Sequence, residues 1–297
     1  MKSVVEIETA PARKRLVQDF AELVKARLTL LVLLTTAVGF YLAAPNPIDY
    51  RALFHVVFGT AAAAAGAAAL NQWWERRVDA LMRRTRSRPV PAGRMPPAEA
   101  LVLGGALSIF GVVYLAMSCN ALSAILAAIT IVIYIFAYTP LKRISTGNTA
   151  LGAVPGAIPP MIGWAAARGG LGAGAWSLFA IVFLWQLPHF FAISWMYRDD
   201  YARAGFRMIS SDDRGGERSA SQSVFFSILL LVLAGLPAFV EMTTAIYLPI
   251  ELALSGIFVA VAMRFLRTRT PADARRLFFA SIIYLPLLLG ALVLTKA

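Results

Sequence analysis

The chain has 297 residues, of which 59% are hydrophobic and 15% charged, and its formal net charge is +12. This polar content is too small to cover a soluble domain, and the apolar residues occur in runs of about 17 to 24, the length that crosses a bilayer as a helix. We therefore expect an all-α polytopic membrane protein. The single cysteine, Cys119, excludes an internal disulfide and a cysteine-built metal site.

The hydrophobic pattern predicts nine membrane-spanning helices. They cover residues 28–44, 52–73, 98–118, 121–140, 149–166, 175–196, 222–240, 246–263 and 277–294. Of the 28 lysines and arginines, 25 fall on one side of the membrane, in segments 1–27, 76–94, 142–143, 198–218 and 264–276. Because such residues collect on the cytoplasmic side, we expect a cytoplasmic N-terminus and an external C-terminus. Topology thus explains the basic excess, and no nucleic-acid partner is expected.

Residues 1–26 precede the first span and are polar and mixed in charge. After Pro11, apolar residues recur at helical spacing, namely Leu16, Val17, Phe20, Leu23 and Val24. This pattern predicts an interfacial helix on the cytoplasmic face. The segment has neither a convincing secretory cleavage site nor the composition of a mitochondrial import signal, so a bacterial cytoplasmic (inner) membrane is favoured. Residues 27–295 are expected to form a single transmembrane domain.

The second span carries an alanine-rich run from Ala61 to Leu70, directly before Asn71. Small residues let membrane helices approach closely, so packing is the favoured explanation. A helix face without side chains could instead leave room for a long, chain-like ligand, and the two explanations are compatible.

A polar cluster follows this run. Asn71, Glu75 and Asp79 are spaced four residues apart and therefore share one face of a helix. Seven arginines lie between positions 76 and 94. Hard oxygen ligands beside a dense guanidinium cluster suit a magnesium–diphosphate group. The alternative is a solvated helix end whose arginines only set the orientation in the membrane.

The fourth and fifth spans carry further signals. The fourth ends in Y-T-P-L-K-R, which places Lys142 and Arg143 at a cytoplasmic end. The fifth contains three prolines, Pro155, Pro159 and Pro160. Proline frees backbone groups that neighbouring helices or a water-lined cavity must satisfy, so we expect a kinked helix in the protein interior.

The sixth span contains His189, directly after Pro188, and is followed by Asp199 and Asp200 with arginines beside them. An ionisable side chain at membrane depth is a functional hypothesis by default. A neutral histidine that hydrogen-bonds across helices is an equally weighted alternative.

The two acidic sites end the second and sixth spans, four helices apart, while basic pairs end the fourth and eighth. This spacing predicts two related four-helix halves plus a ninth helix, with both acidic sites at one cytoplasmic mouth. Such a site suits one reaction class. Magnesium and arginine stabilise a departing diphosphate while an allylic chain becomes a carbocation, and an apolar cavity keeps water away.

Over about residues 20–295 these features resemble the UbiA superfamily of intramembrane prenyltransferases and, within it, the branch that modifies heme. The motifs that carry the resemblance are N-x3-E-x3-D followed by R-R-T-R-S-R-P, then Y-T-P-L-K-R, G-x2-P-G-A-I-P-P, W-Q-L-P-H-F and Y-R-D-D-Y-x2-A-G. The chain departs from many relatives at three positions. Tyr197 and Tyr201 stand where those relatives carry carboxylates, and Glu75 stands where they carry aspartate. The number of metals and the ligands of each are therefore left open.

The resemblance implies transfer of a farnesyl group from farnesyl diphosphate to a vinyl group of heme b, with water adding to give heme O. It also implies a Mg²⁺ cofactor, and heme A synthase or oxidase-assembly proteins as partners. The residues expected to hold magnesium are Asn71, Glu75, Asp79, Asp199 and Asp200. Those expected to bind diphosphate are Arg84, Arg88, Lys142, Arg143 and Arg198. His189 is expected to contact heme, as an iron ligand or a base, with Trp185 and Phe190 as stacking partners.

Two other functions remain open from the sequence. A relative with the same magnesium site would prenylate an aromatic acid or a quinone precursor. A heme carrier or transporter without catalysis would also contain broken helices and related halves. Magnesium dependence separates the enzymes from the carrier.

Overall fold

The computed structural model describes residues 12–297, so residues 1–11 of the predicted interfacial segment lie outside the described part. The described chain forms helices joined by turns, without a β-strand, and one isolated β-bridge pairs Thr243 with Lys296. In chain order the helices are α1 (Ala12–Leu23), α2 (Ala26–Ala43), α3 (Tyr50–Asp79), α4 (Pro97–Ser118), α5 (Ala121–Val132), the π-helix η1 (Ile133–Tyr138), α6 (Thr139–Leu141), α7 (Asn148–Ala157), α8 (Pro159–Arg168), α9 (Ala173–Met196), α10 (Arg198–Arg203), the 3₁₀ helix η2 (Ile209–Asp212), α11 (Glu217–Leu233), α12 (Leu236–Phe239), α13 (Tyr247–Thr268) and α14 (Pro271–Leu294).

Within residues 12–297, nine helical segments are long and apolar enough to cross a membrane, which confirms the predicted number of spans. They are Ala26–Ala43, Tyr50–Asp79, Pro97–Ser118, Ala121–Leu141, Asn148–Arg168, Ala173–Met196, Glu217–Phe239, Tyr247–Thr268 and Pro271–Leu294. Helix α3 continues beyond its predicted membrane span, which ends at residue 73, to Asp79, in agreement with the predicted common helix face of Asn71, Glu75 and Asp79. Its polar end stays helical because Gln72, Glu75 and Asp79 are buried against other elements.

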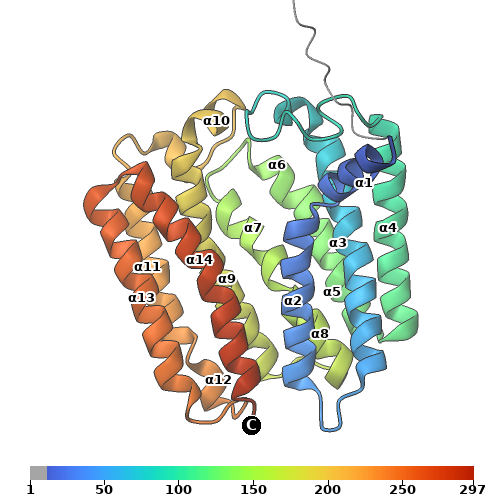
Figure 1. The fold of residues 1–297 in the computed structure, drawn as a ribbon, viewed down its shortest axis with the longest axis vertical. Helices are drawn as coiled ribbons and strands as arrows, with labels where there is room; N and C mark the ends of the chain where they lie inside the picture. The colour runs from blue at the N-terminus through green and yellow to red at the C-terminus, as the bar shows by residue number, and fades with distance from the viewer. Residues whose placement is uncertain (1–11) are drawn as a thin grey trace, which may run out of the picture.

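Two groups of helices lie side by side (Figure 1). One group consists of α2, α3, α4, α5 and α8, the other consists of α9, α11, α13 and α14, and α7 lies between them. The last helix, α14, packs on α9 and α13 and also contacts α2, so the first and last spans meet. The relation between two four-helix halves stays a prediction, because these contacts define no internal symmetry.

The alanine-rich run packs α3 closely against α4. Gly66 of α3 faces Ser108, and Gly111 of α4 faces Ala63, and neither glycine leaves room for a Cβ atom. Such small residues let two helix backbones approach closely in lipid. On this face of α3 the run therefore serves packing, as the sequence analysis favoured.

The fifth span is kinked and interior, as predicted. It consists of α7 and α8, which are separated at Ile158 between Pro155 and Pro159. Its most apolar stretch is 67% buried, the same share as that of α9. Because α8 packs on α2 while α7 packs on α9, this span joins the two groups of helices.

The fourth span contains a π-helical segment that the sequence analysis did not predict. It runs through α5, η1 and α6. Within η1, Tyr134 and Tyr138 stack with ring centroids 5.7 Å apart. Because π-helical turns are rare and often occur at functional sites, the end of the bundle that η1 reaches is a candidate location for a functional site.

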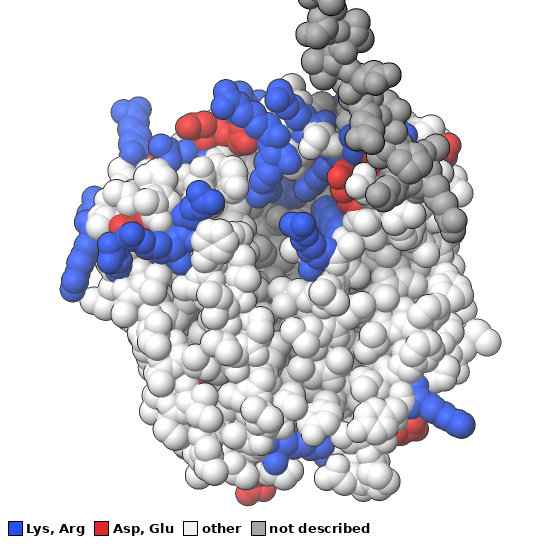
Figure 2. Space-filling view, in the orientation of Figure 1, with Lys and Arg blue, Asp and Glu red and all other residues white. Residues whose placement is uncertain are grey.

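Lysine and arginine collect at the end of the bundle that carries α1, α6 and α10 (Figure 2). We call this the basic end; it comprises the α1–α2 turn and residues 76–94, 142–148 and 197–211. The surface between the basic side chains is hollowed, and the surface below them is almost free of charge until the opposite end (Figure 2). The side view thus shows an apolar belt with one strongly cationic end.

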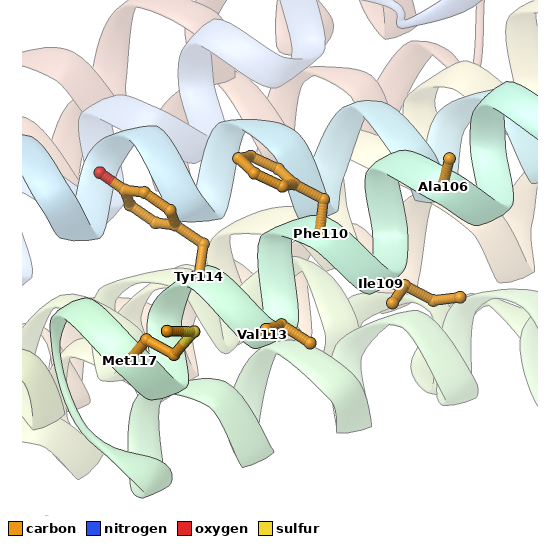
Figure 3. Close-up of a pocket in the computed structure, with 6 residues that line it drawn as sticks. All are labelled: Ala106, Ile109, Phe110, Val113, Tyr114 and Met117. Carbon is orange, nitrogen blue, oxygen red and sulfur yellow. The ribbon is translucent and has the colours of Figure 1, made fainter.

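A shallow groove of about 340 Å³ lies on α4, outside the basic end (Figure 3). It is lined by Ala106, Ile109, Phe110, Val113, Tyr114 and Met117. Ile109 and Met117 are exposed, and the one hydroxyl of this set, on Tyr114, is bonded to His55 Nδ1 at 2.7 Å. An apolar outward surface is what a spanning helix presents to lipid, so we assign this groove no part in the candidate site.

Candidate active site

The last turns of α3 form the centre of the candidate site. Asn71, Glu75 and Asp79 are 0%, 5% and 1% exposed. The four-residue spacing places them on one helix face, as predicted. The solvated helix end that was the alternative is wrong for these three residues, because all of them are buried.

Each of the three side chains is held by a cation from a different segment. Lys25 Nζ donates to Asn71 Oδ1 at 2.6 Å. Lys142 Nζ donates to the two carboxylate oxygens of Glu75 at 2.8 and 3.0 Å. Arg88 Nη1 donates to Asp79 Oδ2 at 2.7 Å. The site thus contains three basic side chains and two carboxylates, and this excess of basic groups favours an anionic ligand.

The orientation of the Asn71 amide follows from its neighbours. Its Nδ2 donates to Glu75 Oε2 at 3.0 Å and to Thr139 Oγ1 at 3.1 Å. The amide oxygen consequently faces Lys25. This arrangement assigns Oδ1, and not Nδ2, as the atom that Asn71 offers to a cation.

Lys25 lies in the turn between α1 and α2 and has a φ of 49°, a left-handed conformation that is uncommon for lysine. Its ammonium also donates to the hydroxyl of Tyr134 at 3.0 Å. Burial, followed by repulsion from Arg88 and Lys142, lowers the pKa of Lys25 to about 7. The sequence analysis did not select Lys25 or Tyr134.

Lys142 follows α6 and lies over the ring of Tyr138, with Nζ 4.4 Å from the ring centroid. Burial lowers the pKa of Lys142, but the Glu75 carboxylate together with Tyr138 and Tyr134 raises it by more, so the pKa lies above its ordinary value and the ammonium stays charged. The backbone N–H of Arg207 donates to the carbonyl of Lys142 at 2.7 Å. This bond ties the segment after the fourth span to the segment after the sixth.

Arg84 joins the two predicted motifs. Its guanidinium carbon lies 5.1 Å from the ring centroid of Tyr197 and 5.6 Å from that of Tyr201. Its Nη2 also donates to the Tyr201 hydroxyl at 3.2 Å. The two tyrosines that stand in place of carboxylates therefore hold an arginine of the first motif by cation–π contacts and a hydrogen bond.

The acids of α10 have a different environment. Asp199 is exposed, its side chain 83% accessible, and its nearest cation is Arg198 at 3.9 Å. Asp200 is less accessible, and it forms an ion pair with Arg203 on the next turn. The structure therefore does not bring these two carboxylates into the hydrogen-bond network of α3.

The remaining predicted diphosphate residues lie at the same end but outside the network. Arg198 covers the ring of Trp195, with its guanidinium carbon 4.5 Å from the centroid, and donates to the Trp195 carbonyl. Arg143 is exposed beside Lys142. Of the five residues predicted to bind diphosphate, Arg84, Arg88 and Lys142 are thus the three whose side chains donate hydrogen bonds to side chains of the two acidic motifs.

The set of oxygens on α3 fits magnesium. Among residues 12–297 no three His, Cys, Asp or Glu side chains come close enough together to hold an ion. Magnesium does not need such a cage, since it usually keeps several waters and binds one or two carboxylates together with substrate phosphates. One amide oxygen and two carboxylates, each already directed at a cation 2.6 to 3.0 Å away, match that requirement.

His189 lies on α9 and faces α14. Its Nδ1 is 2.7 Å from Ser281 Oγ, and that hydroxyl donates to the carbonyl of Phe278 at 2.6 Å. Because the hydroxyl proton is used there, Ser281 Oγ accepts from His189 Nδ1–H, and Nε2 retains its lone pair. The imidazole stacks between Trp185 and Phe278, with centroid distances of 5.4 and 4.9 Å.

The two predicted stacking partners of heme differ in accessibility. Trp185 is buried, and its Nε1 donates to the carbonyl of Ser281 at 2.7 Å. Phe190 is half-buried and tilted by 59° relative to His189. Trp185 therefore orients the histidine, whereas Phe190 is the more accessible of the two rings.

The fold and the site define a multi-pass helical membrane protein with buried oxygen ligands at a cationic end. The UbiA prenyltransferase family matches residues 32–283, and the chain belongs to this family. It is therefore an enzyme of prenyl transfer, and the predicted family is confirmed.

A curated relative agrees with this assignment, and two solved structures share the fold. A protein from Solibacter usitatus described as protoheme IX farnesyltransferase is 43% identical over 288 residues, which cover 94% of this chain and 99% of the relative. A structure from work on digeranylgeranylglyceryl phosphate synthase has a TM-score of 0.79 at 17% identity and covers 94% of this chain and 98% of its own. A UbiA homologue from Archaeoglobus fulgidus, bound to GPP and Mg²⁺, has a TM-score of 0.67 at 15% identity, covering 92% and 99%.

Proposed function

We propose that this enzyme transfers a farnesyl group from farnesyl diphosphate to a vinyl group of heme b, with water adding to give heme O. The observation that carries the diphosphate half of the proposal is the network in which Lys25, Lys142 and Arg88 meet the oxygens of α3. The choice of heme as acceptor is supported by the relative described as protoheme IX farnesyltransferase.

Magnesium is the proposed cofactor. Asn71, Glu75 and Asp79 would hold it from α3, and Asp199 and Asp200 would complete the site from α10. When bound, the metal supplies Lewis-acid stabilisation to the departing diphosphate. The structural neighbour bound to GPP and Mg²⁺ supports this pairing of metal and prenyl diphosphate.

The proposed diphosphate ligands are Arg84, Arg88, Lys142, Arg143 and Arg198. Arg88 and Lys142 already contact the acids of α3, so a small side-chain movement transfers their charge to phosphate oxygens. Arg84 is fixed by Tyr197 and Tyr201 and would bind phosphate without much further loss of side-chain freedom.

His189 is the proposed heme contact. The chain from the Phe278 carbonyl through Ser281 to Nδ1 leaves Nε2 unprotonated, as both an iron ligand and a base require. Replacing His189 with Ala should weaken heme b binding about tenfold, which corresponds to about 1.4 kcal/mol, and should leave farnesyl diphosphate binding unchanged. Absorption titration with heme b measures the effect, and an unchanged heme affinity would remove His189 from the proposal.

The proposed location is a bacterial inner membrane with the basic end in the cytoplasm, because lysine and arginine of membrane proteins collect there. The C-terminus, at the opposite end in Figure 1, would then lie outside. A C-terminal fusion to a reporter that is active only outside the cytoplasm tests this orientation. An inactive reporter on a folded fusion would contradict it.

A turnover assay tests the proposed reaction as a whole. The detergent-purified protein is incubated with heme b, farnesyl diphosphate and magnesium, and mass spectrometry analyses the porphyrin product. We expect a mass gain of farnesyl plus water that disappears with EDTA. Farnesyl appearing on an aromatic acid instead would move the enzyme to another acceptor class, and no magnesium-dependent transfer would contradict the reaction itself.

A further inference from the structure

Lys25 differs from the other two basic residues that contact the polar turns of α3. Its ammonium contacts the Asn71 amide oxygen and the Tyr134 hydroxyl, and no carboxylate bonds to it directly among the described residues. Lys142 and Arg88, in contrast, are each paired with an acid of α3. Lys25 is thus a half-buried basic side chain without a directly bonded carboxylate, and an anionic ligand would supply the missing partner.

The backbone holds Lys25 in this position at an energetic cost. The residue has φ and ψ of 49° and 52°, in the left-handed region that favours glycine. Its carbonyl accepts from the N–H groups of Leu28 and Thr29 at the start of α2. Backbone strain of this kind persists only where the surroundings impose it, and it occurs preferentially at ligand sites.

Helix α1 imposes this position. Gln72 Nε2 donates to the carbonyl of Glu22 at 3.1 Å, and Arg94 forms ion pairs with Asp19 at 2.8 Å and Glu22 at 2.9 Å. These contacts fasten the end of α1 to α3 and to the loop after it. Helix α1 thereby positions Lys25 beside the candidate site.

The atom that Lys25 binds is the one that Asn71 would offer to magnesium. An ammonium in a 2.6 Å contact with Oδ1 and a divalent cation on the same oxygen would repel each other strongly. Lys25 must therefore give up this contact when the metal binds. A diphosphate oxygen carried by the metal is an anion at the right place to accept the ammonium.

We propose that Lys25 is a further diphosphate-binding residue, which exchanges Asn71 Oδ1 for a phosphate oxygen when magnesium diphosphate enters the site. The proposal rests on the proposed magnesium site of α3. It gives α1 a function, because the helix positions the cation.

The proposal predicts two effects of opposite sign. Replacing Lys25 with Met removes the charge that competes for Asn71, so the affinity for Mn²⁺ alone, a magnesium substitute, should rise. The same replacement removes a phosphate contact, so the affinity for a farnesyl thiolodiphosphate analogue with magnesium should fall about 10- to 100-fold. A residue that only supported the fold would weaken both.

The experiment measures Mn²⁺ binding by electron paramagnetic resonance and analogue binding by calorimetry on purified full-length protein. Lys25→Gly is the second variant, because glycine adopts the backbone conformation of this turn and protects against misfolding. Arg27→Met is the matched control; it removes an exposed charge two residues away and should change neither affinity. Unchanged analogue affinity, or weaker Mn²⁺ binding, in the two Lys25 variants would overturn the proposal.

Asp79→Asn separates this inference from the proposed function. If Asp79→Asn abolishes Mn²⁺ binding while both Lys25 variants behave as wild type, the metal site stands and the role of Lys25 is wrong. If Asp79→Asn leaves Mn²⁺ binding intact, the metal site on α3 is wrong, and the exchange proposed for Lys25 fails with it.

Discussion

The acids at the end of α3 and those of α10 belong to the same residue classes and lie at the same end of the molecule, yet their surroundings differ. Glu75 and Asp79 are buried and bonded to cations 67 and 9 residues away in the sequence. Asp199 faces solvent, and Asp200 pairs with an arginine three residues along its own helix. The first site is built by several segments together, whereas the second is largely local.

Because of this difference, the two sites should contribute unequally to ligand binding. A charge in a buried network interacts strongly with its partners, while an exposed charge is screened by water and salt. We therefore expect α3 to dominate metal and diphosphate binding, with α10 as the weaker contributor. Each substitution below changes a residue of one of the two sites.

The largest effect is expected for Asp79→Asn. The amide keeps the size of the side chain but removes the charge that faces Arg88 and the proposed metal, so turnover should fall about 10²- to 10³-fold. Farnesyl transfer to heme b, measured by mass spectrometry on protein of normal elution volume, tests this. Near-normal turnover would mean that α3 is not the dominant site.

Replacing Lys142 with Met should mainly affect stability. It leaves the buried Glu75 carboxylate without its partner, which costs about 3 to 5 kcal/mol. The double variant Lys142→Met/Glu75→Gln removes both charges and should recover most of the lost stability without recovering turnover. Unfolding in detergent measures the stability of the single and of the double variant. If the single and double variants are equally stable, the ion pair between Lys142 and Glu75 contributes less to the free energy of unfolding than expected.

A smaller effect is expected for Asp199→Asn. Because this carboxylate is exposed, its loss should reduce turnover about tenfold and raise the magnesium concentration that gives half-maximal rate. Magnesium titration of the initial rate is the measurement. A loss as complete as that of Asp79→Asn would erase the distinction between the two sites.

The smallest effect is expected for Tyr201→Phe, which removes the hydroxyl bonded to Arg84 and keeps the ring. The KM for farnesyl diphosphate should rise only about threefold, because the ring contact with Arg84 remains and one long hydrogen bond of 3.2 Å is lost. Tyr197→Phe is the control, because among the described contacts Tyr197 meets Arg84 through its ring alone. Equal effects of the two variants would show that the hydroxyl of Tyr201 does not matter.

The sequence predicted those features that depend on spacing along one helix. The nine spans follow from apolar length, and the common face of Asn71, Glu75 and Asp79 follows from the helical repeat. Adjacent residues do not share a face, which explains why Asp199 and Asp200, read as one acidic site, have such different accessibility.

Other features depend on contacts between distant segments and left no pattern in the sequence. Lys25 and Asn71 are 46 residues apart, and Arg84 and Tyr201 are 117 apart. The π-helical turn that presents Tyr134 also has no simple sequence signature. The motif alone shows the two tyrosines as replacements of carboxylates, whereas in the structure their rings contact Arg84.

The length of α3 has a consequence for the path of the substrate. The helix has 30 residues and is therefore about 45 Å long, whereas the hydrocarbon core of a bilayer is about 30 Å thick. Measured from Tyr50, Asn71 lies about 32 Å along the axis, and Asp79 lies about 44 Å along it. With Tyr50 at one boundary of the hydrocarbon core, the polar turns of α3 would lie in the headgroup layer at the other boundary. A prenyl diphosphate can place its diphosphate there while its isoprenoid tail stays in the hydrocarbon core. After bond cleavage, the inorganic product can leave into water, and the lipophilic product stays in the membrane.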